Sequence, residues 1–308
     1  KNNSNSITCR RNEETTTMNL KLITVLTLFI VLLDVSKCSL FGDTTTSPTD
    51  ETSCPPGIAD KSIVKDGISV NLASYPHRIE EGLSVSEIDK DRQLYYVHSF
   101  LSETEADTMR TFCSEPGRFQ RSPQTGIVDT NGDDNNARTS SSCALLFAYF
   151  YLPKYDELEA KSPQLAEELR LTWNVTQRAA KLLGVQEAQM EPFQMLKYNP
   201  GEFYKQHHDH RGYYDAINGY PDRKYTMFLF LNNVQEGGEL KFEKLGLQFS
   251  PRIGDVVIWS NVDSKGVADP DLVHEAMPVK EGFKMGVNIW TRDEPFTHMS
   301  QASNFRKR

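Results

Sequence analysis

The residues that decide the fold of this chain run Tyr198-Asn-Pro-Gly201-Glu-Phe-Tyr204-Lys-Gln-His207-His208-Asp209, and His274 and Lys284 complete the pattern. The pattern is H-x-D, a distant His, and a Lys ten positions after that His. Two imidazoles and one carboxylate bind one face of an iron(II) ion and leave the opposite face open for a chelating co-substrate and oxygen. A Lys side chain is long enough to pair with the far carboxylate of such a co-substrate. We therefore expect a catalytic iron site made by His207, Asp209, His274 and Lys284.

The choice of ligands depends on strand geometry. Alternate side chains of a strand share a face, so His207 and Asp209 are expected to point into the site while His208 points away. His208 and His210 are then expected beside the ligands or on the surface. A competing ligand pair of His208 and His210 lacks the carboxylate that an iron oxygenase needs. His274 is far from Asp209 in sequence, a separation that a β-sandwich can close.

Composition restricts the class of protein. The chain has 308 residues, of which 38% are hydrophobic and 10% aromatic, and this suits one large globular domain with leader segments. The formal net charge of −8 argues against general binding to a phosphate backbone. We therefore expect no nucleic-acid partner.

The N-terminal region has the pattern of a secretory leader. Residues 1–17 are polar and patternless, and we expect an upstream leader there, native or not. Residues 18–38 combine Lys21, a twelve-residue apolar run and small residues before a cut after Cys38, which predicts a cleaved signal peptide. An uncleaved anchor is the first alternative, although the run is short for a bilayer span, and a buried helix is the second. Cleaved or anchored, the protein is expected in the secretory pathway, in the lumen of the endoplasmic reticulum or Golgi, touching the membrane only through an anchor.

Two further features bear on that location. The sequon Asn174-Val175-Thr176 is consistent with a lumenal protein. Cys54, Cys113 and Cys143 follow the leader, so at most one intramolecular disulfide can form among them. Their spacing matches no zinc motif. The sequence does not select the pair, and free or buried thiols are the alternative.

The order of the expected elements predicts an α+β fold. Residues 39–91 are expected to be a linker and N-terminal extension. A capping box at Ser102 predicts a helix towards Cys113, and Ser162 followed by proline predicts a second helix that ends before Gly184. From Glu191 onward, short β-rich runs separated by turn residues predict a jelly roll, also described as a double-stranded β-helix, with the helices on one face. Three further expectations concern a strand over 93–100, a strand over 138–147, and a domain over 92–295 followed by a tail over 296–308.

Further matched blocks extend the pattern beyond the metal ligands. Residues from about 92 to 292 resemble the catalytic domain of prolyl 4-hydroxylases of the short plant and algal kind. The family pattern R-Y-x-x-G-x-x-Y-x-x-H-x-D is matched from Lys197 to Asp209, and H-x-x-x-P-V-x-x-G-x-K is matched in full from His274 to Lys284. The remaining matches are the E-E-G-G-E turn at Gln235-Glu-Gly-Gly-Glu239, the G-D-A-L-x-F strand at Gly254-Asp-Val-Val-Ile-Trp259, and the R-T-S-S strand at Arg138-Thr-Ser-Ser141.

The resemblance implies a reaction and a role for each residue. The reaction is hydroxylation of peptidyl proline to 4-hydroxyproline, coupled to oxidative decarboxylation of 2-oxoglutarate to succinate and CO2 with O2, Fe(II) and ascorbate. His207, Asp209 and His274 would hold the iron. Lys284, Tyr198 and Thr226 would bind 2-oxoglutarate. A proline-rich peptide would contact Arg138, Tyr204 and Trp290, because a polyproline II ligand docks on aromatic grooves, and residues 121–137 would form a mobile lid.

The chain departs from the family at three positions, and two other functions stay open. Arg292 stands where the family often has His in the peptide groove, Lys197 replaces Arg, and His208 replaces an aromatic residue. The Arg292 position favours the first alternative, a 2-oxoglutarate oxygenase that acts on another residue or a small molecule. The second alternative is a non-catalytic jelly-roll binding module, which predicts the loss of a metal ligand or of Lys284. A hydrolytic zinc enzyme would need an acid/base motif that the sequence does not supply.

Overall fold

The structure, a computed structural model, describes residues 61–123, 137–212, 215 and 220–295. These residues belong to one compact unit. The leader, the signal peptide or anchor, the first part of the linker, Cys54, most of the expected lid and the C-terminal tail lie outside the described residues. Within the described ranges, no helix is long and apolar enough to cross a membrane.

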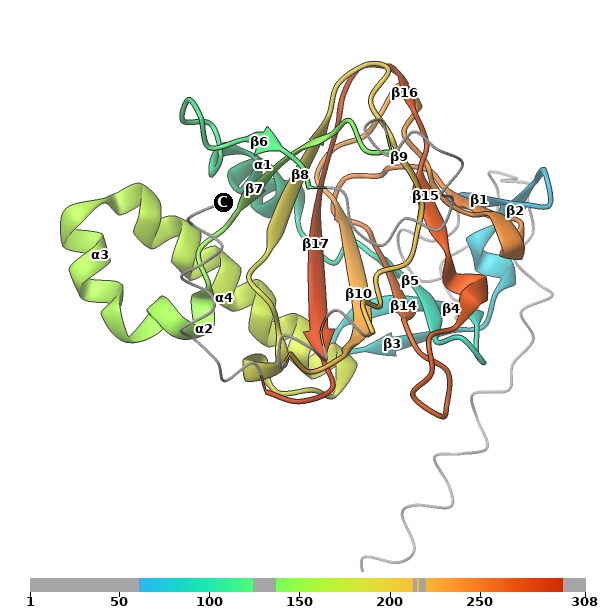
Figure 1. Cartoon of the computed structure of the whole chain (residues 1–308), viewed down its shortest axis with the longest axis horizontal. Coiled ribbons are helices and arrows are strands. Elements are labelled where there is room, and N and C mark those ends of the chain that lie inside the picture. Colours follow the sequence, from blue (N-terminus) through green and yellow to red (C-terminus); the bar gives the residue numbers. More distant parts are fainter. Residues whose placement is uncertain (1–60, 124–136, 213–214, 216–219, 296–308) are drawn as a thin grey trace, which may run out of the picture. The chain divides into compact units, whose positions relative to one another are not determined.

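Two antiparallel sheets form the framework (Figure 1). The order of the larger, nine-stranded sheet is β3 (His77–Glu80), β4 (Leu83–Asp89), β5 (Leu94–His98), β14 (Val256–Ser260), β10 (Arg223–Phe230), β17 (Lys284–Arg292), β8 (Gln194–Tyr198), β7 (Ser141–Ala144) and β6 (Gln120–Arg121). The order of the six-stranded sheet is β2 (Ile68–Asn71), β1 (Ser62–Lys65), β13 (Leu247–Phe249), β12 (Leu240–Phe242), β15 (His274–Ala276) and β9 (Tyr204–His207). A small ribbon pairs β11 (Glu236–Gly237) with β16 (Val279–Glu281).

Aromatic side chains fill the space between the two sheets. Phe242 and Phe249 of the smaller sheet pack with Trp259 and Phe230 of the larger one in a single buried cluster. The rings of Phe242 and Trp259 meet edge to face with centroids 5.2 Å apart, an arrangement that aromatic pairs prefer. This sandwich is the predicted jelly-roll core, and it pairs β9 with β15 although the two strands are distant in sequence.

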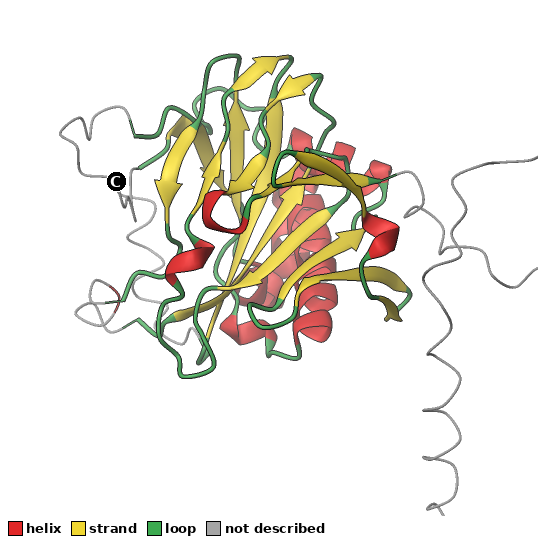
Figure 2. Cartoon of the chain, turned by 90° about the vertical axis from the view of Figure 1, so that its right-hand side faces the viewer, coloured by secondary structure: helices red, strands yellow, loops and turns green. Residues whose placement is uncertain are grey.

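Helices cover the outer face of the larger sheet (Figure 2). Helix α1 (Glu103–Thr111) begins at Ser102 with the predicted capping box. Helix α4 (Pro163–Leu183) begins at Ser162 and ends at Gly184, whose φ of 64° is the left-handed conformation that glycine adopts most easily. Their apolar faces pack on strand residues in one buried cluster. The α+β prediction with helices on one face is therefore confirmed; α2 (Ala148–Tyr151) and α3 (Tyr155–Lys161) were not predicted.

Five short 3-10 turns complete the secondary structure of the described residues. They are Leu72–Ser74, Leu152–Lys154, Glu187–Gln189, Glu243–Leu245 and Pro270–Leu272.

The folded domain begins earlier than the predicted boundary at residue 92. Strand β1 pairs with β13, and β4 pairs with β5, so residues 62–89 extend both sheets. Strands β2 and β3 are short and carry exposed Ile68 and Ile79, which hides the alternation that marks a strand in sequence. The predicted strand over 138–147 is also shorter, since only Ser141–Ala144 pairs with β8.

A disulfide joins two of the three cysteines that the sequence left unassigned. Cys113 follows α1 and Cys143 lies in β7, and their sulfur atoms are bonded. Both residues are buried in the cluster that joins the helices to the larger sheet. The bridge therefore fixes the end of α1 to the strand next to β8.

Candidate active site

The three predicted iron ligands meet at one end of the smaller sheet. His207 is the last residue of β9 and His274 the first of β15, and the two are direct partners in the antiparallel pairing. Asp209 lies beyond the end of β9, so the predicted strand through Asp209 is wrong. The ladder stops at His207 because its partner strand begins at His274. The chain bends there and still brings Asp209 to the two imidazoles.

The ligand atoms are close enough for one ion to reach all three. Nε2 of His207 lies 3.9 Å from Oδ1 of Asp209, and Nε2 of His274 lies 3.8 Å from Oδ2. All three ligand atoms lie within 4.8 Å of one another, and all three residues are buried. Among the described residues this is the one group of such donors close enough to hold a metal ion.

Backbone contacts prepare both imidazoles to bind a metal. Nδ1 of His207 lies 2.8 Å from the Lys205 carbonyl, and Nδ1 of His274 lies 2.9 Å from the Leu272 carbonyl. A carbonyl only accepts, so each Nδ1 carries the proton and each Nε2 has a free lone pair. Burial lowers the pKa of His207 well below its usual value, which keeps this ring neutral. Burial raises the pKa of Asp209, but the neighbouring His274 and His207 outweigh this effect, and the pKa lies below its usual range.

Lys284 and Tyr198 form a polar pair at the predicted co-substrate end. They are direct partners in β17 and β8. The side chain of Lys284 is 0% exposed, and its Nζ has no hydrogen-bond partner among the described residues. Burial lowers the pKa of Lys284 to about 7, although Glu239 opposes this effect. A buried amine without a counter-ion is costly unless an anion completes the site, so the residues present fit a bound carboxylate.

Tyr204 and Arg138 form a stack on an iron ligand. The Tyr204 ring lies face to face with His207, with centroids 3.6 Å apart, and the Arg138 guanidinium lies 4.4 Å from the Tyr204 centroid. Both residues are buried. Nη1 of Arg138 donates to the Pro123 carbonyl, at the start of the segment predicted to be a lid. These positions place both residues at the iron site, and their contact with a peptide stays a prediction.

Thr226 and Trp290 are cross-strand partners in β10 and β17. The Thr226 hydroxyl donates to Oδ2 of Asp209 at 2.9 Å and accepts from Nδ2 of Asn261 at 2.9 Å. These hydrogen bonds join Thr226 to a metal ligand, whereas the family resemblance suggested a place in the co-substrate pocket. Trp290 is buried, and the guanidinium of Arg223 lies 3.7 Å from its ring centroid.

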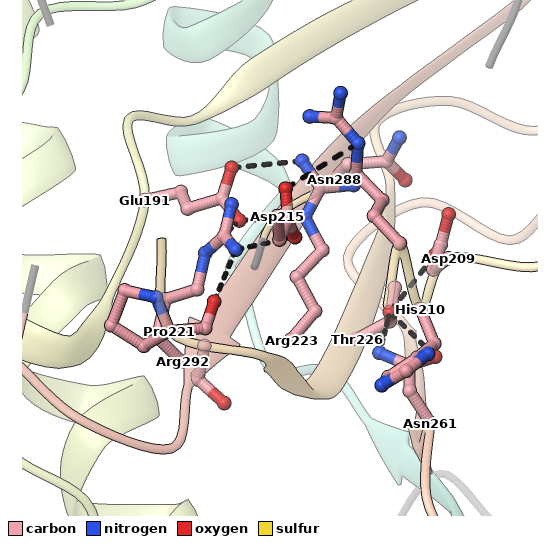
Figure 3. Close-up of polar contacts among 12 residues, drawn as sticks. Glu191, Asp209, His210, Asp215, Pro221, Arg223, Thr226, Asn261, Asn288 and Arg292 are labelled. Atoms are coloured by element: carbon pink, nitrogen blue, oxygen red, sulfur yellow. Dashed lines mark hydrogen bonds and ion pairs between the residues drawn. The ribbon is translucent and has the colours of Figure 1, made fainter. Parts of the chain in front are cut away.

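A network of buried charges lies beside these residues (Figure 3). Arg223 donates to both carboxylate oxygens of Glu191, at 2.6 and 2.8 Å. Arg292, only 2% exposed, lies 2.7 Å from Glu191 and donates to Asp215 at 2.7 Å. The Arg292 side chain therefore forms internal ion pairs. Its presence at this position no longer favours an oxygenase that acts on another residue or a small molecule. Sequence reasoning missed Glu191, Asp215 and Arg223, because single charged residues carry no motif.

The two remaining histidines of the motif lie outside the ligand group, as expected. Nε2 of His208 lies 2.9 Å from the carbonyl oxygen of Asp269. Burial lowers the pKa of His208, and the backbone contact with Asp269 opposes this effect. Nε2 of His210 lies 3.6 Å from a carboxylate oxygen of Asp222. The competing ligand pair is therefore not assembled.

Comparisons with known proteins agree with this site. Residues 193–292 match the model of the 2OG-Fe(II) oxygenase superfamily, a range that includes all three ligands and Lys284. Probable prolyl 4-hydroxylase 6 of Arabidopsis thaliana is 25% identical over 233 residues, which are 69% of this chain and 73% of that protein. Prolyl 4-hydroxylase 13 of the same plant is 32% identical over 123 residues, 34% of this chain and 44% of that protein.

A solved structure, the viral collagen prolyl hydroxylase of Paramecium Bursaria Chlorella virus-1 in complex with 2OG, aligns with a TM-score of 0.47 at 21% identity, covering 65% of this chain and 95% of that one. The superfamily match and the plant relatives agree with the ligand group assembled by β9 and β15. Residues 193–292 are thus similar to the 2OG-Fe(II) oxygenase superfamily, and a longer part of the chain is similar to plant prolyl 4-hydroxylases.

Proposed function

We propose that this chain hydroxylates peptidyl proline to 4-hydroxyproline and couples this reaction to the oxidative decarboxylation of 2-oxoglutarate to succinate and CO2. The observation that carries the proposal is the buried group of His207, Asp209 and His274 in a domain similar to prolyl 4-hydroxylases. The three metal-binding residues and Lys284 are all present, which argues against the non-catalytic binding module.

Different residues would bind the metal and the co-substrate. His207, Asp209 and His274 would hold Fe(II), which together with 2-oxoglutarate and O2 supplies the oxidising chemistry. Lys284 would pair as a single buried cation with the distal carboxylate of 2-oxoglutarate, and Tyr198 lies beside it. The surrounding aromatic core would exclude water from this ion pair and so strengthen it.

The proposed peptide is proline-rich. Tyr204 and Trp290 place two aromatic rings near the metal ligands, and aromatic surfaces suit preformed polyproline II segments. Ascorbate is proposed as the reductant on family resemblance alone.

The proposed location is the lumen of the secretory pathway, reached through residues 18–38 as a signal peptide or an anchor. The buried Cys113–Cys143 bridge supports an oxidising compartment. Asn174 of the sequon is exposed on α4, where a glycan would meet solvent.

The test measures succinate formation by the purified protein with Fe(II), 2-oxoglutarate and ascorbate, with and without a polyproline peptide. Peptide-stimulated turnover and a peptide mass increased by one oxygen atom are expected. His207→Ala should abolish both, whereas His77→Ala, a matched change on distant β3, should leave both intact. Turnover that ignores the peptide would contradict the substrate, and no turnover by an iron-loaded protein would contradict the enzyme.

A further inference from the structure

A hydrogen-bonded chain of buried side chains ends on the carboxylate of Asp209. Thr226 of β10 donates to Oδ2 of Asp209 at 2.9 Å. Asn261, which follows β14, lies on the other side of Thr226 with its Nδ2 2.9 Å from the Thr226 hydroxyl. Thr226 and Asn261 are fully buried, and Asp209 nearly so. Thr226 lies in β10 and Asn261 directly follows the neighbouring strand β14 of the larger sheet, whereas Asp209 follows β9 of the smaller sheet, and Figure 3 shows the three side chains side by side.

The donors and acceptors along this series of hydrogen bonds determine which group donates at each step. The carboxylate of Asp209 only accepts, so the hydrogen of the Thr226 hydroxyl is directed to Oδ2. The hydroxyl oxygen is then free to accept from the Asn261 amide nitrogen, which only donates. The longer contact of 3.3 Å between the Thr226 hydroxyl and Oδ1 of Asn261 competes poorly, because a charged acceptor makes the stronger bond.

We propose that Thr226, oriented by Asn261, is a positioning residue for the metal site. It holds Oδ2 of Asp209, and this leaves Oδ1 of the same carboxylate for the ion. This role differs from the co-substrate contact that the family resemblance suggested for Thr226. It rests on the metal site of the proposed function, but it does not depend on which substrate is hydroxylated.

The cross-strand pairing shows why this position is rigid. Thr226 pairs with Trp259 on one side and Trp290 on the other, in the middle of a nine-stranded sheet. Its backbone cannot shift without moving both neighbours. A hydroxyl held in this way restricts the rotation of the Asp209 carboxylate, and outer contacts of this kind typically contribute about 10- to 100-fold to metal affinity.

The experiment compares metal affinity in full-length variants. Thr226→Val keeps the shape of the side chain and removes the hydroxyl, and Thr226→Ser restores the hydroxyl. Thr172→Val is the matched control, because Thr172 is another buried threonine whose hydroxyl bonds only to the backbone of α4. Dissociation constants for Fe(II) under anaerobic conditions and for Co(II) are measured by competition with a chelator. The visible spectrum of the Co(II) form reports the ligand geometry.

Thr226→Val is expected to weaken metal binding by about 10- to 100-fold and to change the Co(II) spectrum. Thr226→Ser and Thr172→Val should stay within about threefold of the wild type on the same scale. Wild-type affinity and an unchanged spectrum in Thr226→Val would overturn the inference while leaving the proposed function intact. A wild-type protein that binds neither ion would overturn both.

A second variant covers the case in which Thr226→Val does not fold. Asn261→Ala leaves Thr226 in place and removes only the group that orients its hydroxyl. Weaker metal binding by Asn261→Ala supports the inference, and unchanged binding contradicts it.

Discussion

The lone buried amine of Lys284 predicts opposite effects of one substitution on stability and on ligand binding. Burial lowers its pKa from 10.5 to about 7. Each pKa unit corresponds to about 1.4 kcal/mol. The buried charge therefore lowers the free energy of unfolding of the ligand-free protein by about 5 kcal/mol at any pH where the amine is protonated in both the folded and the unfolded state. Lys284→Met keeps most of the side-chain volume and removes the charge. The shorter side chain leaves a small void that costs about 1 kcal/mol.

The gain in stability should depend on pH. Because the folded-state pKa is below the unfolded one, the unfolded chain binds more protons between pH 7 and 10.5, and wild-type stability rises with pH across this window. Lys284→Met should therefore raise the free energy of unfolding by about 4 kcal/mol at about pH 6, and by only about 1 kcal/mol at about pH 9. The same variant should lose 2-oxoglutarate binding, since no cation remains for the distal carboxylate.

The assay is urea unfolding of the ligand-free protein at several pH values, with calorimetry of 2-oxoglutarate binding to the metal-loaded form. Lys90→Met is the control, because Lys90 is exposed in a turn. It should change neither stability nor its pH dependence. A Lys284→Met protein that is no more stable than the wild type at about pH 6 would refute the reasoning, because the amine would then have a partner or solvent.

Three other outcomes are expected. The dissociation constant of 2-oxoglutarate should rise above pH 7, by up to about tenfold per pH unit, because binding then requires Lys284 to take up a proton; calorimetry that finds a flat profile to about pH 9 would contradict this. Replacing Cys113 and Cys143 together by Ala should lower the free energy of unfolding by about 3–4 kcal/mol, since their separation of 30 residues sets the size of the closed loop; denaturation that shows no loss would disprove it. Expression in a secretory host should give a protein whose glycan is removed by Asn174→Gln, and equal electrophoretic mobility of both proteins would speak against lumenal passage.

Local signals predicted helices α1 and α4 well. The capping box at Ser102 and the pair of Ser162 and Gly184 around α4 act within a few residues, so the sequence contains all that their detection needs. The N-terminal strands had no such signal. Val64 pairs with Gln248, and this partner can be identified only once the sandwich has formed. The boundary at residue 92 failed for that reason.

The same distinction applies within the active site. Iron restricts its ligands to a few residue types, and a buried carboxylate calls for a cation, so His207, Asp209, His274 and Lys284 can be recognised from type and spacing. Thr226 and Asn261 have no such restriction, because a hydroxyl and an amide occur in every class of protein. Their role follows from the register that sets Thr226 between two tryptophans and over Asp209. Chemistry therefore identifies the groups that touch the metal, whereas topology decides which ordinary side chains hold them in place.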